Sequence, residues 1–137
     1  MATRKVRCEL LTGSKTRGTQ KIQAAIDSGW LKIWDKLVQP LKGIDLDEGE
    51  TACISFALGY SGETLLIIDE KAGRAVAKEK GIPIIGTAAI IGLAKDRGYI
   101  SSARDTFETL HTSDFRVSVD VIKTVLLRVG ELNDTEI

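Results

Sequence analysis

Acidic residues at the ends of predicted elements are the side chains in this sequence best suited to chemistry. Asp69 follows the apolar run 64–68 and precedes Glu70, while Glu50 stands near the start of a predicted helix. Ligands gather at the carboxyl ends of strands in open parallel sheets, and carboxylates with few histidines favour Mg²⁺ or Mn²⁺. If that helix packs beside the sheet, Glu50 and Asp69 can share one cation. The competing interpretation is structural, with Asp69 and Glu70 as first-turn carboxylates and Glu50 as part of a capping box.

A basic cluster lies near the start of the chain, although the whole sequence balances 19 Lys and Arg against 19 Asp and Glu. Residues 1–46 hold nine basic and four acidic residues, so this segment carries +5 and the remainder −5. Basic clusters attract polyanions, and a divalent ion beside one would serve phosphate chemistry. A solvated basic turn is the alternative interpretation. The predicted phosphate contacts are Arg4, Lys5, Arg7, Lys15 and Arg17.

Several other chemistries lack the residues that they need. The sequence has neither a G-x-G-x-x-G fingerprint nor a Walker loop. Cys8 and Cys53 have no metal-binding spacing, and the single histidine, His111, cannot complete a usual zinc site. We expect His111 to cap the C-terminus of a helix. Because no apolar run reaches the roughly 18 residues of a membrane span and no secretory signal follows the basic start, we expect a cytoplasmic protein without a membrane partner.

The hydrophobic pattern predicts helices alternating with strands. Helix starts are marked by Asp47, Thr87 and Ser118 as capping residues. Strand, helix, strand and helix with short joins indicate a βαβ unit. We therefore expect one α/β domain over residues 1–137, in three layers with a short parallel sheet, although three strands are few for such a sheet. Helices are expected over residues 20–28, 47–62, 71–80, 87–98, 101–111 and 118–130, and strands over residues 31–34, 64–68 and 82–85.

Motifs from about Val6 to Glu131 resemble those of an uncharacterised prokaryotic group of PIN-like domains. Residues 7–13, which include Glu9, resemble the E-L-L-x-G segment that carries an acidic residue in PIN domains. Residues 46–57 resemble the helix start D-x-G-E-x-x-x-I-x-x-A, and residues 65–70 resemble the strand that ends in a metal-site Asp. The likeness continues through Arg74, Ala77, Gly86-Thr87, 93–95, Gly98, 115–118, 125–126 and 130–131.

This resemblance implies a nucleic-acid-processing protein. PIN domains are three-layer α/β folds, and many are Mg²⁺- or Mn²⁺-dependent endoribonucleases, including the toxins of toxin–antitoxin pairs. Carried over by position, the resemblance implies that Glu9, Glu50 and Asp69 are catalytic metal ligands, with Glu70 as a further ligand and Asp47 as a neighbour. RNA is then the implied substrate, and an antitoxin is an implied protein partner.

One departure from the PIN pattern bears on activity. PIN domains begin with a central strand that ends in Asp followed by Thr or Ser, and no such segment precedes the E-L-L motif here. The sequence therefore predicts an N-terminally truncated domain, with an exposed apolar edge that favours homo-oligomers. We expect weak or no RNA hydrolysis by this chain alone. The alternative function is a non-catalytic binding or regulatory module that pairs with itself or with an antitoxin-like protein.

Overall fold

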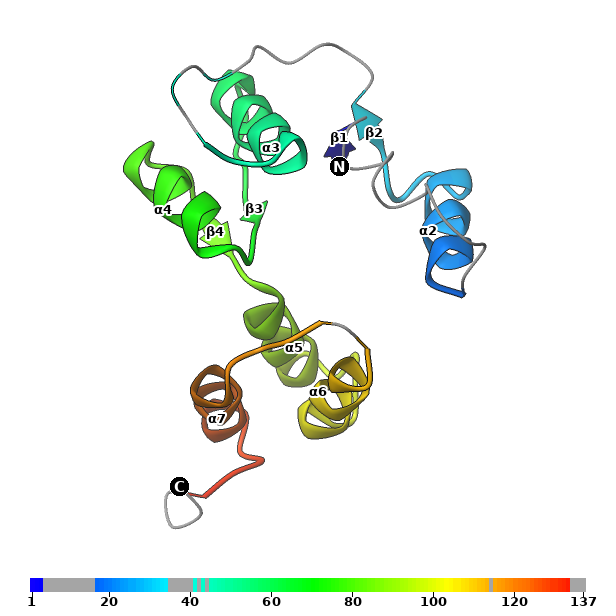
Figure 1. Cartoon of the computed structure of the whole chain (residues 1–137). Helices are drawn as coiled ribbons and strands as arrows, with labels where there is room; N and C mark the ends of the chain where they lie inside the picture. Colours follow the sequence, from blue (N-terminus) through cyan, green and yellow to red (C-terminus); the bar gives the residue numbers. More distant parts are fainter. Residues whose placement is uncertain (4–16, 35–40, 42, 44, 114, 134–137) are drawn as a thin grey trace. The chain divides into compact units, whose positions relative to one another are not determined.

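The computed structural model describes residues 1–3, 17–34, 41, 43, 45–113 and 115–133 (Figure 1). The chain forms two compact units, residues 1–84 and residues 85–137. The first combines helices with short strands, and the second contains three helices, so the predicted α/β class is confirmed. Among the described residues, no helix combines the length and the apolar character that crossing a membrane requires.

The first unit opens with a strand that the sequence pattern does not reveal. β1 (Ala2–Thr3) pairs in parallel with β2 (Ile33–Trp34), and Ala2 lies opposite Ile33. The Ala2 amide donates a hydrogen bond of 2.8 Å to the Lys32 carbonyl oxygen. A two-residue strand has too little periodicity to be recognised, and its partner lies about thirty positions away in the sequence.

A second pair of strands follows later in the same unit. β3 (Leu66–Ile67) pairs with β4 (Ile84–Ile85), which begins where the first unit ends. The Leu66 amide donates to the Pro83 carbonyl oxygen at 2.9 Å. The sequence predicts three strands in one sheet, whereas the described residues form four strands in two separate pairs. The expectation of a single sheet is thus corrected to two two-stranded sheets.

Three helices complete the first unit. They are α2 (Arg17–Asp27), α3 (Glu48–Gly59) and α4 (Lys71–Glu79). α3 contacts β1, β3 and α4, which explains why its apolar residues do not keep to one stripe. Ile54 of α3 is fully buried, in a core with Ile68, Ala77 and Ile82.

Local sequence signals account for the start of α3. Asp47 is its N-cap, and Asp47 Oδ1 accepts a hydrogen bond of 2.8 Å from the Glu50 amide. The Thr51 hydroxyl donates to the Asp47 carbonyl oxygen at 2.8 Å. These bonds satisfy groups that a helix leaves unpaired at its first turn. The predicted N-cap is therefore confirmed.

The second unit packs three helices around one core. These are α5 (Thr87–Asp96), α6 (Ala103–His111) and α7 (Val119–Arg128). Ser118 caps α7 as the sequence predicts, and Ser102 caps α6 near the predicted helix start, but Gly86 takes the N-cap position of α5. Thr87, the predicted cap, is instead the first helical residue. The core residues are Ala88, Ile91, Ala103, Phe107, Val125 and Leu126.

Both ends of α6 are bound by side chains from later in the chain. At its start, the Glu131 carboxylate accepts hydrogen bonds from the Ala103 amide at 2.6 Å and the Ser102 hydroxyl at 3.0 Å. At its end, Arg116 Nη1 donates to the carbonyl oxygen of His111 at 3.1 Å. His111 lies in the last turn, as expected, but Arg116 is the side chain that binds a terminal carbonyl there.

Candidate functional site

Two of the candidate carboxylates lie where the chain passes from β3 into α4. Asp69 and Glu70 directly follow the buried Ile68, and both side chains are exposed. Glu70 is the N-cap residue of α4, but its side chain makes no capping hydrogen bond. Glu70 thus occupies a capping position without acting as a side-chain cap, and its carboxylate faces solvent.

Glu50, in the first turn of α3, lies against the first turn of α4. Its Oε1 atom is buried, and a β-carbon built on Gly73 would lie 3.1 Å from that atom. The same β-carbon would lie 2.5 Å from Ile68 Cδ1. Gly73 is buried in the first turn of α4, so the absence of a side chain there lets Glu50 and Ile68 approach. Glu50 and Ile68, the residue that follows β3, therefore meet at Gly73.

Arg74 binds the backbone of Ile68, the residue that follows β3. Arg74 Nη1 donates to the Ile68 carbonyl oxygen at 3.0 Å, and the Arg74 side chain is half-buried. The guanidinium consequently binds the peptide group that links Ile68 to Asp69. It adds positive charge where the chain presents two exposed carboxylates.

The roles of Gly73 and Arg74 are not predicted from the sequence. A glycine inside an otherwise regular helix is the one available signal, because such a glycine often marks a close approach by another group. Arg74 contributes to the PIN resemblance, but no local pattern indicates that its side chain returns six residues to Ile68. This contact depends on the path between β3 and α4.

The described carboxylates were expected to form a metal site with Glu9. Mg²⁺ and Mn²⁺ require several oxygen ligands around one point. Within the described part of the chain, no three His, Cys, Asp or Glu side chains form such a group. Glu50, Asp69 and Glu70 alone therefore do not fit a three-ligand metal site, and Glu9 lies outside the described residues.

The predicted phosphate contacts lie almost entirely outside the described residues. Arg17 is described as the first residue of α2. Closer to the carboxylates, Lys71 and Arg74 supply basic groups in the first turns of α4. The predicted residues outside the description are Arg4, Lys5, Arg7 and Lys15.

Comparison with known proteins gives one informative match. Neither the curated proteins nor the solved structures contain a match to the chain. A family model, DUF3368, described as a PIN domain, matches residues 1–131. The match runs through both compact units and spans Glu9, Glu50, Asp69 and Glu70. Because it covers nearly the whole chain, this protein belongs to the PIN domain family.

Proposed function

We propose that this PIN domain binds single-stranded RNA and is related to the metal-dependent endoribonucleases. The observation that carries the proposal is the placement of the Glu50 carboxylate against Gly73, next to the segment that leads into Asp69. Ligands of parallel α/β proteins bind at the carboxyl ends of strands. Membership of the PIN family gives the same position a nucleic-acid-binding or nuclease context.

Mg²⁺ or Mn²⁺ is the proposed cofactor. Glu9, Glu50, Asp69 and Glu70 are the residues that would hold it, and a bound ion would neutralise charge on a phosphodiester. Since the described residues alone form no three-ligand group, ion binding needs Glu9 or another oxygen donor.

RNA is the proposed nucleic acid because of the family and the basic start of the chain. The cluster Arg4, Lys5, Arg7, Lys15 and Arg17 contains five positive charges within fourteen positions, with Glu9 as the only acid between them. Such clusters bind phosphates by releasing counterions, without reading the base sequence. The proposal therefore includes RNA binding of low sequence specificity.

A metal-binding and cleavage assay tests the acidic site. We expect millimolar Mn²⁺ to raise the Tm of the full chain, because an ion that binds only the folded state stabilises it. Asp69→Asn and Glu50→Gln should each reduce this shift, and any cleavage of a labelled single-stranded RNA should fall with it. Glu79→Gln is the matched control, since Glu79 is an exposed acid at the opposite end of α4.

The two parts of the proposal fail separately. An equal Mn²⁺ shift in the parent chain and in Asp69→Asn would show that Asp69 is not a ligand. Absence of RNA binding at low salt, measured by fluorescence anisotropy with the same oligomer, would refute the nucleic-acid function.

A non-catalytic binding module, which pairs with itself or with an antitoxin-like protein, is the second candidate. It is favoured by Leu65, which precedes β3, and by Ile67 in β3, because these aliphatic side chains are 60% and 61% exposed. Exposed apolar groups that lie together commonly mark an interaction surface. This candidate predicts protein binding without any Mn²⁺-dependent change in Tm.

A further inference from the structure

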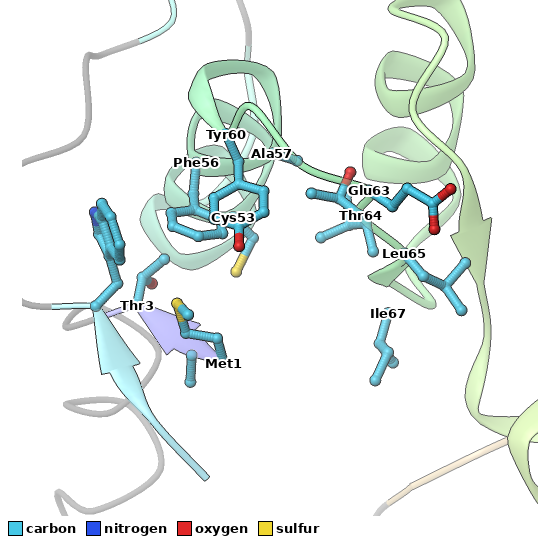
Figure 2. A pocket seen from close by; sticks show the side chains of 13 residues that line it. Met1, Thr3, Cys53, Phe56, Ala57, Tyr60, Glu63, Thr64, Leu65 and Ile67 are labelled. Carbon is cyan, nitrogen blue, oxygen red and sulfur yellow. The ribbon is translucent and has the colours of Figure 1, made fainter.

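Aromatic side chains line cavities in both compact units, but they differ in what their rings contact. In the first unit, Phe56 and Tyr60 line a groove of about 570 Å³ (Figure 2). Their rings stack with centroids 5.4 Å apart, and Trp34 meets Phe56 edge-on at 4.8 Å. The aromatic faces in this groove are therefore partly covered by one another.

A smaller pocket lies beside α6 in the second unit. Its volume is about 380 Å³, which falls within the range of about 300–1,000 Å³ for small-molecule sites. Tyr99 lines it from the connection between α5 and α6, and Asp105, Thr106 and Thr109 line it from α6. All of its lining residues belong to the second unit, so this α6 pocket is built without the candidate metal ligands.

Tyr99 presents an uncovered ring on a fixed backbone. Its side chain is 79% exposed, and within the described residues it has no hydrogen bond and no ring contact. The Tyr99 amide donates to the Ala94 carbonyl oxygen at 2.9 Å, directly after Gly98 turns the chain with a φ of 74°. The backbone is thus fixed while the flat face of the ring stays open, which suits stacking of a planar group.

The α6 wall of the pocket offers hydrogen-bond acceptors. The Thr106 and Thr109 hydroxyls donate to the carbonyl oxygens of Ser102 and Asp105, each at 2.9 Å. Each hydroxyl therefore keeps only its acceptor capacity for a ligand. The Asp105 carboxylate accepts no hydrogen bond from the described part of the chain. A ligand that fits this wall must consequently bring donor groups.

The connection that carries Tyr99 is held by side-chain contacts before any ligand binds. Lys95 Nζ donates to the Ser101 carbonyl oxygen at 2.7 Å, and the Ser102 hydroxyl donates to Glu131 at 3.0 Å. A site that is ordered in advance binds with a smaller entropy cost. The Lys95 ammonium also places positive charge beside the pocket, which disfavours a cationic occupant and attracts phosphates that flank an uncharged one.

A ribonucleoside unit matches these walls. Its base is a planar group for the face of Tyr99. Its ribose hydroxyls are donors for Asp105, which is how an acidic residue binds ribose in dinucleotide-binding folds. In RNA, phosphates flank each ribose, which suits the charge of Lys95. DNA lacks the 2′-hydroxyl, so a contact with this group distinguishes RNA from DNA.

We infer that the α6 pocket binds one ribonucleoside unit of single-stranded RNA, with its base stacked on Tyr99 and its 2′-hydroxyl donating to Asp105. The site depends on the proposed RNA binding for its ligand, but not on whether the carboxylates bind metal. It gives the second unit a preference for RNA over DNA, which phosphate contacts at the basic cluster do not provide.

Amide chemical shifts of the isotope-labelled full chain test the pocket directly. We expect adenosine to shift the amides of residues 99–106 in a saturable manner and to leave those of α3 unchanged. 2′-Deoxyadenosine should bind at least about threefold more weakly, because it lacks one donor for Asp105. Tyr99→Ala should abolish the shifts of the neighbouring amides, whereas Tyr99→Phe should preserve them because the flat ring is retained.

RNA affinity tests whether the pocket contacts a nucleic-acid strand. The probes are labelled single-stranded RNA and DNA of the same adenine and cytosine sequence, titrated by fluorescence anisotropy. Tyr99→Ala should weaken RNA binding by about fivefold or more, because one stacked base is lost. Asp105→Asn should reduce the preference for RNA over DNA by about threefold or more. Glu108→Gln is the matched control and should change neither value, because Glu108 is an exposed acid of α6 that does not line the pocket.

The inferred site is supported by one combination of results. Adenosine must shift the pocket amides, Tyr99→Ala must lose RNA affinity, and Asp105→Asn must lose the preference for RNA. Equal gains in RNA and DNA affinity for Asp105→Asn would overturn the ribose contact, because Asp105 would then only repel phosphates. Adenosine shifts without any effect of Tyr99→Ala on RNA affinity would assign the pocket to a free nucleoside and overturn the contact with a strand.

Failure of this site and failure of the proposed function give different results. If RNA binds equally to the parent chain, Tyr99→Ala and Asp105→Asn, and adenosine shifts no pocket amide, the site is wrong and RNA binding stands. If RNA does not bind even at low salt, the proposed function is refuted, and the adenosine titration alone decides whether the pocket holds a ribonucleoside.

Discussion

Replacing Gly73 by alanine tests the close packing of Glu50 and Ile68 around this glycine. A β-carbon there would lie 2.5 Å from Ile68 Cδ1, and Ile68 is buried in the core of the first unit. Overpacking of a core costs about 1–3 kcal/mol, whereas Gly to Ala gains about 1 kcal/mol of helix propensity. We expect Gly73→Ala to destabilise the chain by about 1 kcal/mol in urea unfolding.

The control for this substitution is another glycine in a helix. Gly59, the last residue of α3, has no atom within 4 Å of the position where a β-carbon would stand. Gly59→Ala should therefore be neutral or stabilise the chain by up to about 1 kcal/mol. The same effect of both substitutions on the urea midpoint would contradict the tight packing of Glu50 and Ile68 around Gly73.

The helices and three of the four described strands were predictable from local sequence, but β1 and the pairing of the strands were not. Asp47 and Ser118 act as the caps that their spacing predicts, because a cap depends on residues three positions away. β1 was missed because its two residues are defined by pairing with a distant segment. The approach of α3 to the end of β3 was anticipated. The contact of Glu50 and Ile68 with Gly73 was not, because it depends on tertiary packing.

Glu131 ties the start of α6 to the segment after α7, and this connection should depend on pH. Partial burial alone would raise the pKa of the Glu131 carboxyl, but hydrogen bonds from the Ala103 and Arg104 amides and the Ser102 hydroxyl outweigh it. With the charge of Lys95, they lower the pKa below its ordinary value of 4.5. A lowered folded-state pKa stabilises the protein above the unfolded-state pKa, and this stability is lost as the pH falls through the folded-state pKa.

Glu131→Gln should therefore destabilise the second unit at pH 7 and have a smaller effect in acid. We expect a loss of about 1 kcal/mol at pH 7, similar to the loss of a helix cap. Thermal unfolding at pH 7 and at pH 3.5 measures the difference, with Glu108→Gln as the control for an exposed acid on α6. A penalty for Glu131→Gln that is the same at both pH values would contradict the assigned charge interactions.

At the scale of the whole molecule, positive and negative charges are distributed unevenly along the sequence. The segment of residues 1–46 carries +5, and the remaining residues carry −5, although the formal net charge is zero. The carboxylates Glu50, Asp69 and Glu70 all belong to the acidic remainder. A polyanion is therefore attracted by one part of the chain and repelled by the other, so RNA affinity should depend on the basic segment rather than on net charge.

The salt dependence of RNA binding measures how many of these basic groups meet phosphates. For single strands, log K falls with log salt with a slope of about −0.7 per phosphate contact, so five contacts give a slope of about −3.5. Replacing Lys5 and Arg7 together with Gln should bring the slope to about −2, whereas Lys78→Gln at the far end of α4 should leave it unchanged. Anisotropy titrations of a single-stranded RNA at several salt concentrations give these slopes. A slope that is unaffected by the paired substitution would show that Lys5 and Arg7 do not contact phosphates, because each lost contact must reduce counterion release.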